Sequence, residues 1–295
     1  MAMNIKEAAK QFDAQRRRCR AFYFIYGLGM IAGLAMMFLQ QMKAALLFFS
    51  LLLIVYFVVV RSNLKQYTAD WREFCVRLFT EKYFAPVSYT YAAKADRLPL
   101  YTKHTLMPKS EKGKLLARNL ASGSREGIEA MFLDSTVPTG DGSSTRFYSG
   151  CWMGFAFDSF VRENIRIVKG ELLVPGAYKN WLIRSEGFKP CAAPEGMPKD
   201  CAVFSASGAL DLPLDVIVPL KKLLKIMSVD GVIEISPEGL FVFLPHRLIN
   251  KLPPSLKYPI TENMIDRLTF PEIDAAHALA QHIHGFTSDK KGERV

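Results

Sequence analysis

The chain has 295 residues, of which half are apolar and 22% are charged, and its formal net charge is +10. That apolar fraction excludes a wholly disordered chain, and five cysteines in this length exclude a disulfide scaffold. We therefore expect a folded protein with one large domain or two small ones.

Two long uncharged runs stand near the N-terminus. No charged residue occurs in 21–42, and after Lys43 a second uncharged run covers 44–60. About 20 apolar residues in a helix cross a bilayer core of roughly 30 Å. Neither run keeps the polar face of a soluble core helix, and no signal-peptide cleavage site follows the first run. Residues 21–61 are therefore predicted to form a two-span transmembrane hairpin.

Basic residues are concentrated on both flanks of this hairpin. The N-terminal segment 1–20 carries a charge of +4 and 61–126 carries +7, whereas the turn between the spans has only Lys43. Basic flanks stay in the cytoplasm, so we expect a bacterial inner-membrane protein with both termini in the cytoplasm. Anionic lipid attracts such cations, and the residues expected to contact lipid headgroups are Arg16, Arg17, Arg18, Arg20, Arg61 and Lys65. Lipid accounts for this basic cluster, and no nucleic-acid partner is expected because no binding motif is found.

A G-x-x-x-G step in the first span is formed by Gly29 and Gly33. Small residues at this spacing let two helix backbones approach closely. We expect the step to pack the first span on the second within one chain, with dimerisation as the alternative. Cys19, between two arginines beside the bilayer, is expected to be unmodified, and acylation is the alternative.

Residues 62–84 are predicted to form a juxtamembrane helix that ends before Pro86. Its apolar positions recur at spacings of three and four, which is typical of a heptad seam, and they are Leu64, Tyr67, Trp71, Phe74 and Leu78. Two heptads are too few for a coiled coil. We therefore expect this face to pack on the domain that follows, with association between copies as the alternative.

Residues 85–286 are predicted to form a cytoplasmic domain, followed by a flexible polar tail at 287–295. The expected strands are 87–92, 128–133, 146–157, 165–174 and 201–207, with a hairpin at 232–236 and 240–244. Helices are expected at 212–227 and 271–286, and loops at 138–145 and 191–200. The predicted fold class is α+β, with an N-terminal transmembrane helical hairpin, a helical arm and a mainly antiparallel sheet with packed helices.

The strongest strand pattern is that of 146–157. Both of its faces are apolar or small, which is typical of a strand in the middle of a sheet. The preceding stretch 93–127 is basic and has no clear period. Within it, the glycines of 123–127 lack the lysine of a phosphate-binding loop, so we interpret this segment as a turn.

No motif for catalysis is present in the sequence. We therefore expect no catalytic, cofactor-binding or metal-binding residue, and no cofactor. Three histidines, His277, His282 and His284, lie close together. On a helix, the first and last would lie about 10.5 Å apart, which is too far for a shared metal ion. The cysteines of a cytoplasmic domain are expected to be reduced.

The layout resembles a bacterial family of unknown function. Three stretches carry the resemblance: the span pair 21–60, the strand Phe147–Asp158, and Cys201–Phe204 with the following helix and hairpin. The strand is similar to the family's aromatic F-x-G-x-F-F-x-x-D-F pattern. The basic stretch 104–127 departs from the family, which has an acidic Y-x-G-x-D stretch there. The resemblance implies two N-terminal spans, a helical arm and a cytoplasmic α+β domain, and it implies no catalytic residue.

These observations predict a membrane-anchored, cytoplasmic-facing adaptor or scaffold that binds a protein partner or anionic lipid and is not an enzyme. The alternative is a membrane-associated enzyme of unrecognised type that acts on a lipid or an envelope precursor, since many active sites leave no local motif. A homo-oligomer formed through the spans remains open.

Overall fold

The computed structural model describes residues 4–39, 41–84, 87–94, 116–139, 146–170, 188–210, 212–227, 230–245 and 254–292. The chain divides into two compact units: unit 1 comprises Met1–Cys75 and Leu252–Thr269, and unit 2 comprises Val76–Lys251 and Phe270–Val295. The predicted α+β class, with long N-terminal helices, a helical arm and an antiparallel sheet, is confirmed. The division between units differs from the predicted one, because it falls inside the arm and assigns a late segment to unit 1.

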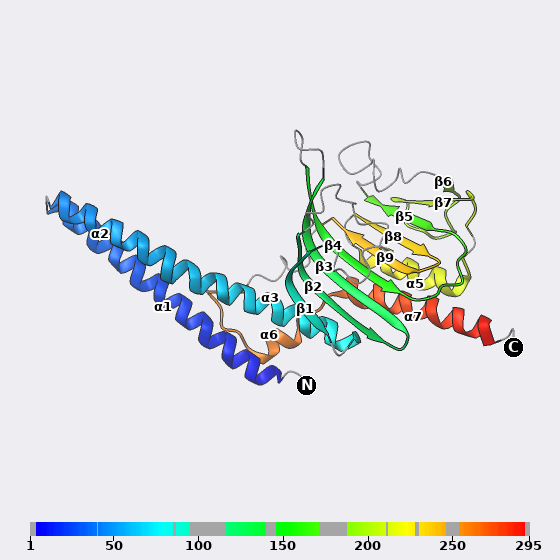
Figure 1. Ribbon diagram of the computed structural model, residues 1–295, viewed down its shortest axis with the longest axis horizontal. Helices are drawn as coiled ribbons and strands as arrows, with labels where there is room; N and C mark the ends of the chain where they lie inside the picture. Colours follow the sequence, from blue (N-terminus) through cyan, green and yellow to red (C-terminus); the bar gives the residue numbers. More distant parts are fainter. Residues whose placement is uncertain are drawn as a thin grey trace. The chain divides into compact units, whose positions relative to one another are not determined.

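Unit 1 is built on long helices. Helix α1 spans Ile5–Phe38, and α2, Met42–Val55, continues through the π-helical turn η1, Tyr56–Val60, into α3, Arg61–Phe84. Helix α1 ends at Phe38, before the turn expected around Lys43, and α2 runs back along α1 (Figure 1). By length and composition, α1 and the continuous helix Met42–Lys82 are each long and apolar enough to cross a membrane.

The lower parts of α1 and α3 pack through aromatic rings. The ring centroid of Phe12 lies 5.1 Å from that of Trp71 and 5.0 Å from that of Phe74. Trp71 is fully buried. Helix α1 continues as one helix down to Ile5 and so brings Phe12 against Trp71 and Phe74 of α3, a contact that was not predicted. Packing of the seam on the following domain stays a prediction.

A segment from late in the sequence completes unit 1. We call residues 254–269 the strap; it contains the short helix α6, Glu262–Asp266, whose N-cap Thr261 accepts a hydrogen bond from the Met264 amide at 3.2 Å. Sequence patterns did not predict this helix. The strap contacts α1 across 240 and 247 residues of sequence.

In the described part of unit 2, nine strands form one antiparallel sheet, in the order β1-β2-β3-β4-β9-β8-β5-β7-β6. The strands are β1 Ser88–Lys94, β2 Leu116–Arg125, β3 Ile128–Thr139, β4 Arg146–Ala156, β5 Ile165–Lys169, β6 Lys189–Cys191, β7 Cys201–Ser205, β8 Gly231–Ser236 and β9 Gly239–Leu244. Helices α5, Leu214–Ile226, and α7, Pro271–Gly292, lie side by side along the sheet (Figure 1).

Most predicted strands are present, and β4 lies between β3 and β9 as the central position requires. Strand β2 was not predicted, and it joins β3 through a two-residue turn in which Glu126 (φ 54°) and Gly127 (φ 78°) both adopt positive φ. That is the type I′ geometry favoured in hairpins. The loop predicted at 138–145 is wrong at Pro138 and Thr139, which belong to β3; residues 140–145 lie outside the described residues.

Strand β5 is shorter than predicted. It ends at Lys169, before Gly170 with φ 77°, and residues 171–174 of the predicted strand lie outside the described residues. The buried Lys169 ammonium donates to the carbonyl oxygens of Leu224, at 2.7 Å, and Met227 at the end of α5. A cation at this position satisfies carbonyl groups that have no partner within the helix.

The two helices of unit 2 follow the predicted periodicity. The predicted apolar face of α5 is buried, with Val216, Ile217, Leu220, Leu223 and Leu224 on it. Helix α7 continues to Gly292, so the predicted end at Phe286 is too early. Thr287, expected in a flexible tail, is buried, and its hydroxyl accepts a hydrogen bond from the Phe160 amide at 3.0 Å.

Candidate functional site

The upper part of unit 1 has an apolar surface that faces outward. Large side chains of α1 and α2 are exposed along the whole hairpin; Phe24 is 67% exposed and Leu47 is 76% exposed. Folded soluble proteins rarely keep contiguous apolar patches beyond a few hundred Å² in water. The exposed apolar side chains of the hairpin therefore favour an apolar environment around it, such as lipid or another apolar surface.

Aromatic rings and arginines meet at the lower end of this apolar surface. The rings of Tyr26 and Tyr56 have centroids 5.2 Å apart. The Arg61 guanidinium lies 5.3 Å from the Phe57 ring centroid, and that of Arg18 lies 5.6 Å from the Phe22 centroid. Tyrosine rings and basic groups prefer the boundary between the hydrocarbon core and the headgroups. The arrangement is thus suited to a membrane interface at this end.

The two glycines of the G-x-x-x-G step lie on the α1 face that meets α2. A Cβ atom added to Gly33 would lie 2.6 Å from the Phe49 ring, and one added to Gly29 would lie 2.8 Å from Leu52. Added to Gly27, it would meet no atom within 4 Å. The missing side chains at 29 and 33 therefore allow α1 and α2 of the same chain to approach.

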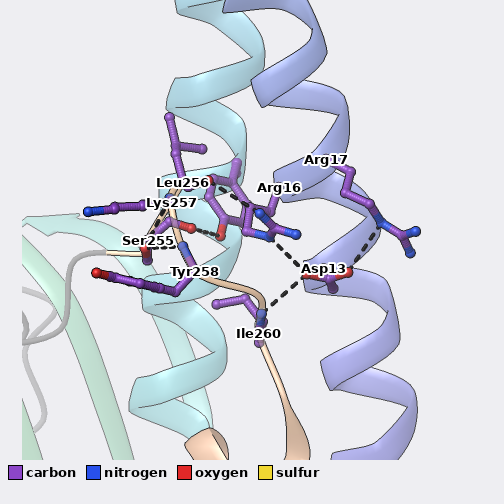
Figure 2. Close-up of polar contacts among 9 residues, drawn as sticks. Asp13, Arg16, Arg17, Ser255, Leu256, Lys257, Tyr258 and Ile260 are labelled. Carbon is purple, nitrogen blue, oxygen red and sulfur yellow. Dashed lines mark hydrogen bonds and ion pairs between the residues drawn. The ribbon is translucent and has the colours of Figure 1, made fainter.

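Below the aromatic rings, the carboxylate of Asp13 joins α1 to the strap (Figure 2). It accepts a hydrogen bond from Arg16 Nε at 2.8 Å and one from the Ile260 amide at 3.2 Å, and Arg17 Nε lies 3.2 Å from its other oxygen. Arg16 is buried, and its guanidinium also donates to the Leu256 carbonyl at 3.3 Å. One acid and one buried base thus fix the strap at two points.

The upper turn of the strap is held from α3 as well. The Tyr67 hydroxyl donates to the Ser255 carbonyl at 3.3 Å. The Ser255 hydroxyl accepts hydrogen bonds from the backbone amides of Lys257, at 3.1 Å, and Tyr258, at 3.0 Å. Local bonds of this kind fix a turn without other secondary structure. We call residues 255–258 the strap apex.

Electrostatics favour the ionised form of Asp13. Partial burial raises the pKa of its carboxyl, but the hydrogen bonds from Arg16 and Ile260 and the charges of Arg16 and Arg17 outweigh this effect. The net pKa therefore lies below the ordinary value of 3.8. Burial raises the pKa of the Tyr67 phenol to about 12, even though the nearby Arg16 charge lowers it. At neutral pH the hydroxyl therefore stays a hydrogen-bond donor for the strap.

An open groove of about 470 Å³ runs between α1 and the lower strap. Its α1 wall carries Lys6, Lys10 and Arg17, and its strap wall carries Glu262 and Asn263. The groove holds both signs of charge, so it attracts neither a simple anion nor a simple cation strongly.

The six residues predicted to contact lipid differ in their exposure. Five of them are exposed: Arg17, Arg18, Arg20, Arg61 and Lys65. Arg16 is 6% exposed and is engaged with Asp13 and the strap, so the structure gives it a packing role that was not predicted. Lipid contact by the exposed residues stays a prediction. Cys19 is buried on the α1 face that also carries Arg16.

Unit 2 contains a buried ion pair inside the sheet. Arg166 of β5 and Glu234 of β8 are opposite one another in register, and Arg166 Nε donates to the Glu234 carboxylate at 2.8 Å. Asn164 adds a hydrogen bond to the same carboxylate at 3.2 Å, and the Phe188 ring centroid lies 4.5 Å from the guanidinium. A buried charge is stable only with such partners.

The described part of unit 2 contains a small apolar pocket and histidines that pack on aromatic rings. This pocket, beside Phe84, Met131 and Phe155, has an apolar lining and about 20 Å³ of space, roughly one water molecule. Among the residues that the structure describes, no three His, Cys, Asp or Glu side chains are grouped closely enough to hold a metal ion. His277 packs edge-on against the Phe84 ring at 5.1 Å, and His284 packs against Phe157 at 5.6 Å.

Sequence reasoning missed Asp13 and the whole strap. The spacing of Asp13 from Arg16 and Arg17, three and four residues, is a signal for ion pairs on one helix face. The partners Leu256 and Ile260 carry no local signal, because their role depends on a contact with a helix far away in sequence.

Comparisons with known proteins add little. No protein-family model and no curated protein matches the chain. Among solved structures, the chain is similar to the crystal structure of the mycobacterial trehalose monomycolate transport factor A, TtfA, with a TM-score of 0.36 and 8% identity, over 72% of this chain and 96% of that chain. Similarity this low identifies no family, so the resemblance to a bacterial family of unknown function stays a prediction.

Proposed function

We propose that the protein is a non-enzymatic adaptor anchored in the bacterial inner membrane by the α1–α2 hairpin. Both termini and unit 2 lie in the cytoplasm, the basic residues beside the spans contact anionic lipid, and unit 2 binds a protein partner. The single observation that supports this most is the exposed apolar surface of the hairpin, because only hydrocarbon covers such a surface on several sides at once.

The orientation is supported by the position of the arginines. Arg18 and Arg61 stack on aromatic rings at the end of the hairpin from which both α1 and α3 leave the apolar surface. The opposite end has only Lys43. Basic residues retained on one side of a bilayer mark the cytoplasmic side.

Two native cysteines of unit 2 can report the orientation. Cys191 and Cys201 are half-buried, whereas Cys19, Cys75 and Cys151 are buried. Burial and the nearby Asp200 raise the pKa of the Cys201 thiol to about 11, so this thiol reacts more slowly with maleimide. A membrane-impermeant maleimide should therefore label Cys191 in inverted membrane vesicles and leave it unlabelled in intact spheroplasts. A Gln41→Cys variant in the turn of the hairpin should show the reverse.

Cys191→Ser is the matched control, since it should remove most of the labelling in inverted vesicles. Labelling of Cys191 in spheroplasts would contradict the proposed orientation. Extraction of the protein by alkaline carbonate would contradict the anchor itself.

The adaptor part of the proposal is supported by an apolar pair on α5. Leu214 and Val218, one helical turn apart, are 77% and 67% exposed, and the exposed Lys222 follows one turn later on the same face. Apolar contacts surrounded by charges are common at protein interfaces.

This part is tested by a photo-crosslinking amino acid at Val218 in the full-length protein at native level in cells. We expect a reproducible adduct with one other protein, which Leu214→Asp should weaken, and no such adduct from the exposed position Lys199 of the same unit. Adducts from Val218 with the protein itself alone, or the same adducts from Lys199, would contradict the adaptor role.

A further inference from the structure

The strap apex presents a lysine and a tyrosine side by side. Lys257 is exposed and Tyr258 is 62% exposed, and the Lys257 ammonium lies 5.2 Å from the Tyr258 ring centroid. Figure 2 shows both side chains projecting away from α1, sideways from the helices. An aromatic ring with a polar end beside a cation is the combination that membrane interfaces favour.

The backbone of the apex is held near the ends of both apolar runs. Arg16, which binds the Leu256 carbonyl, lies five residues before Ala21, and Tyr67, which binds the Ser255 carbonyl, lies seven residues after Val60. At about 1.5 Å per residue these anchors lie roughly 7 to 11 Å below the apolar runs. The headgroup layer reaches about 5 to 8 Å beyond the hydrocarbon core, and a lysine side chain extends toward it by snorkelling.

Exposed basic residues of α1 and α3 also lie near the ends of the apolar runs, as the apex does. Arg17 and Arg20 come from α1 and Lys65 comes from α3, and all three are exposed. Lys257 adds a cation from a segment that is far from the spans in sequence. Because the apex is bonded to both helices, it has little conformational freedom to lose when it binds.

We infer that the strap apex is a third membrane contact of unit 1, in which Tyr258 lies in the headgroup layer and Lys257 binds anionic lipid headgroups. This inference rests on the proposed membrane anchor. It goes beyond that anchor because it assigns lipid recognition to a segment that the sequence places in the cytoplasmic domain.

The test uses the full-length protein with p-benzoylphenylalanine at Tyr258, reconstituted into vesicles of phosphatidylcholine with or without phosphatidylglycerol. Irradiation followed by mass spectrometry identifies lipid adducts. Position 258 should form adducts with phosphatidylglycerol in the anionic vesicles, and Lys257→Ala should reduce their yield about five-fold. Ile31, exposed within the first span, serves as the marker of insertion, and Asn263, exposed on the lower strap, serves as the matched control.

Failure of the anchor and failure of this inference give different results. Position 31 without lipid adducts would contradict the membrane anchor. Adducts at 31 but none at 258, or equal adducts at 258 and 263, would overturn the apex contact. Equal yields at 258 from both vesicle types, unchanged by Lys257→Ala, would overturn the recognition of anionic headgroups. Adducts from 258 with protein in place of lipid would show that the apex binds a macromolecule instead.

Discussion

In unit 2, the β9 residues Phe241 and Phe243 are completely buried, whereas in unit 1 the hairpin residues Phe24 and Phe57 are 67% and 49% exposed. The residue type is the same, but other residues of unit 2 bury the β9 side chains, whereas no described part of the chain buries those of the hairpin. The polar residues show the converse pattern: Arg166 and Glu234 are enclosed by unit 2, while most basic residues of unit 1 line the outside below the spans. The large apolar side chains of unit 2 are mostly covered by its own packing, whereas those of the hairpin are left exposed, as the proposed bilayer anchor requires.

The largest effect should come from the buried ion pair of unit 2. Glu234→Ala leaves Arg166 buried without its carboxylate, so we expect the free energy of unfolding to fall by about 3–5 kcal/mol. Thermal unfolding of the full-length protein in detergent, followed by near-UV circular dichroism, measures the change. The exposed Glu238 of the same hairpin is the control, and its replacement by alanine should have an effect within about 0.5 kcal/mol. Recovery in the double variant Arg166→Met, Glu234→Leu would show that the loss came from the unpaired charge.

The second effect concerns the environment of the hairpin. Ile31 lies in the middle of the first span and is exposed. In hydrocarbon, Ile31→Arg should cost about 2.5–3.5 kcal/mol, so the fraction of protein that resists carbonate extraction should fall. Leu214→Arg makes a comparable change at an exposed leucine of unit 2 and should leave this fraction unchanged. If both variants stay fully in the membrane fraction, the contrast between the units is wrong.

The third effect concerns the contact between Asp13 of α1 and the strap. Asp13→Asn removes an ionised acceptor of charge-assisted hydrogen bonds, and we expect a loss of about 1–3 kcal/mol. Hydrogen exchange of the Ile260 amide, which donates to Asp13, should become faster. Exposed Glu7 of the same helix is the control, and Glu7→Gln should leave this amide unchanged.

The same carboxylate predicts a pH dependence. The folded-state pKa of Asp13 lies below 3.8, so its stabilising effect is complete above that pH and is lost as the pH falls through the folded-state pKa. In the wild type, protection of the Ile260 amide should therefore decrease on acidification below about 3.8. An equal decrease in the Asp13→Asn variant would assign the effect to another group.

The smallest effect separates two glycines of the first span. Gly33→Ala forces the Phe49 ring to move and should cost about 1 kcal/mol. Gly27→Ala meets open space and should be neutral or slightly stabilising, because alanine favours a helix. Thermal denaturation in detergent compares the two. Equal destabilisation by both would indicate that α1 also packs on another chain through Gly27.

Local patterns were sufficient for elements that carry their own signal. The uncharged runs gave the hairpin, alternation gave β4, and the spacing of Val216 to Leu224 gave α5. Strand β2 was not predicted, because its polar and small residues, such as Asn119 and Ser122, do not alternate with apolar ones. Its conformation is fixed by pairing with β3. The strap was not predicted, because its position depends on contacts with Asp13, Arg16 and Tyr67, which are far from it in sequence.

For the candidate site, composition located the basic residues but could not divide their roles. From the sequence alone, the six basic residues beside the spans cannot be distinguished in their roles. Packing separates Arg16, whose guanidinium is enclosed between Asp13 and Leu256, from Arg17, whose side chain is 70% exposed. Such a division requires the partner segment, which sequence spacing alone does not reveal.

The long sequence separation of the strap has a consequence for biosynthesis. Asp13 and Ile260 are 247 residues apart, and at about 5–20 residues per second the ribosome needs roughly 12–50 s to make the intervening chain. During that interval Arg16, which is buried in the folded protein, lacks the Leu256 carbonyl. The contacts between α1 and the strap therefore form late, and if the hairpin inserts into a membrane as proposed, an early stop in translation leaves it there without the strap.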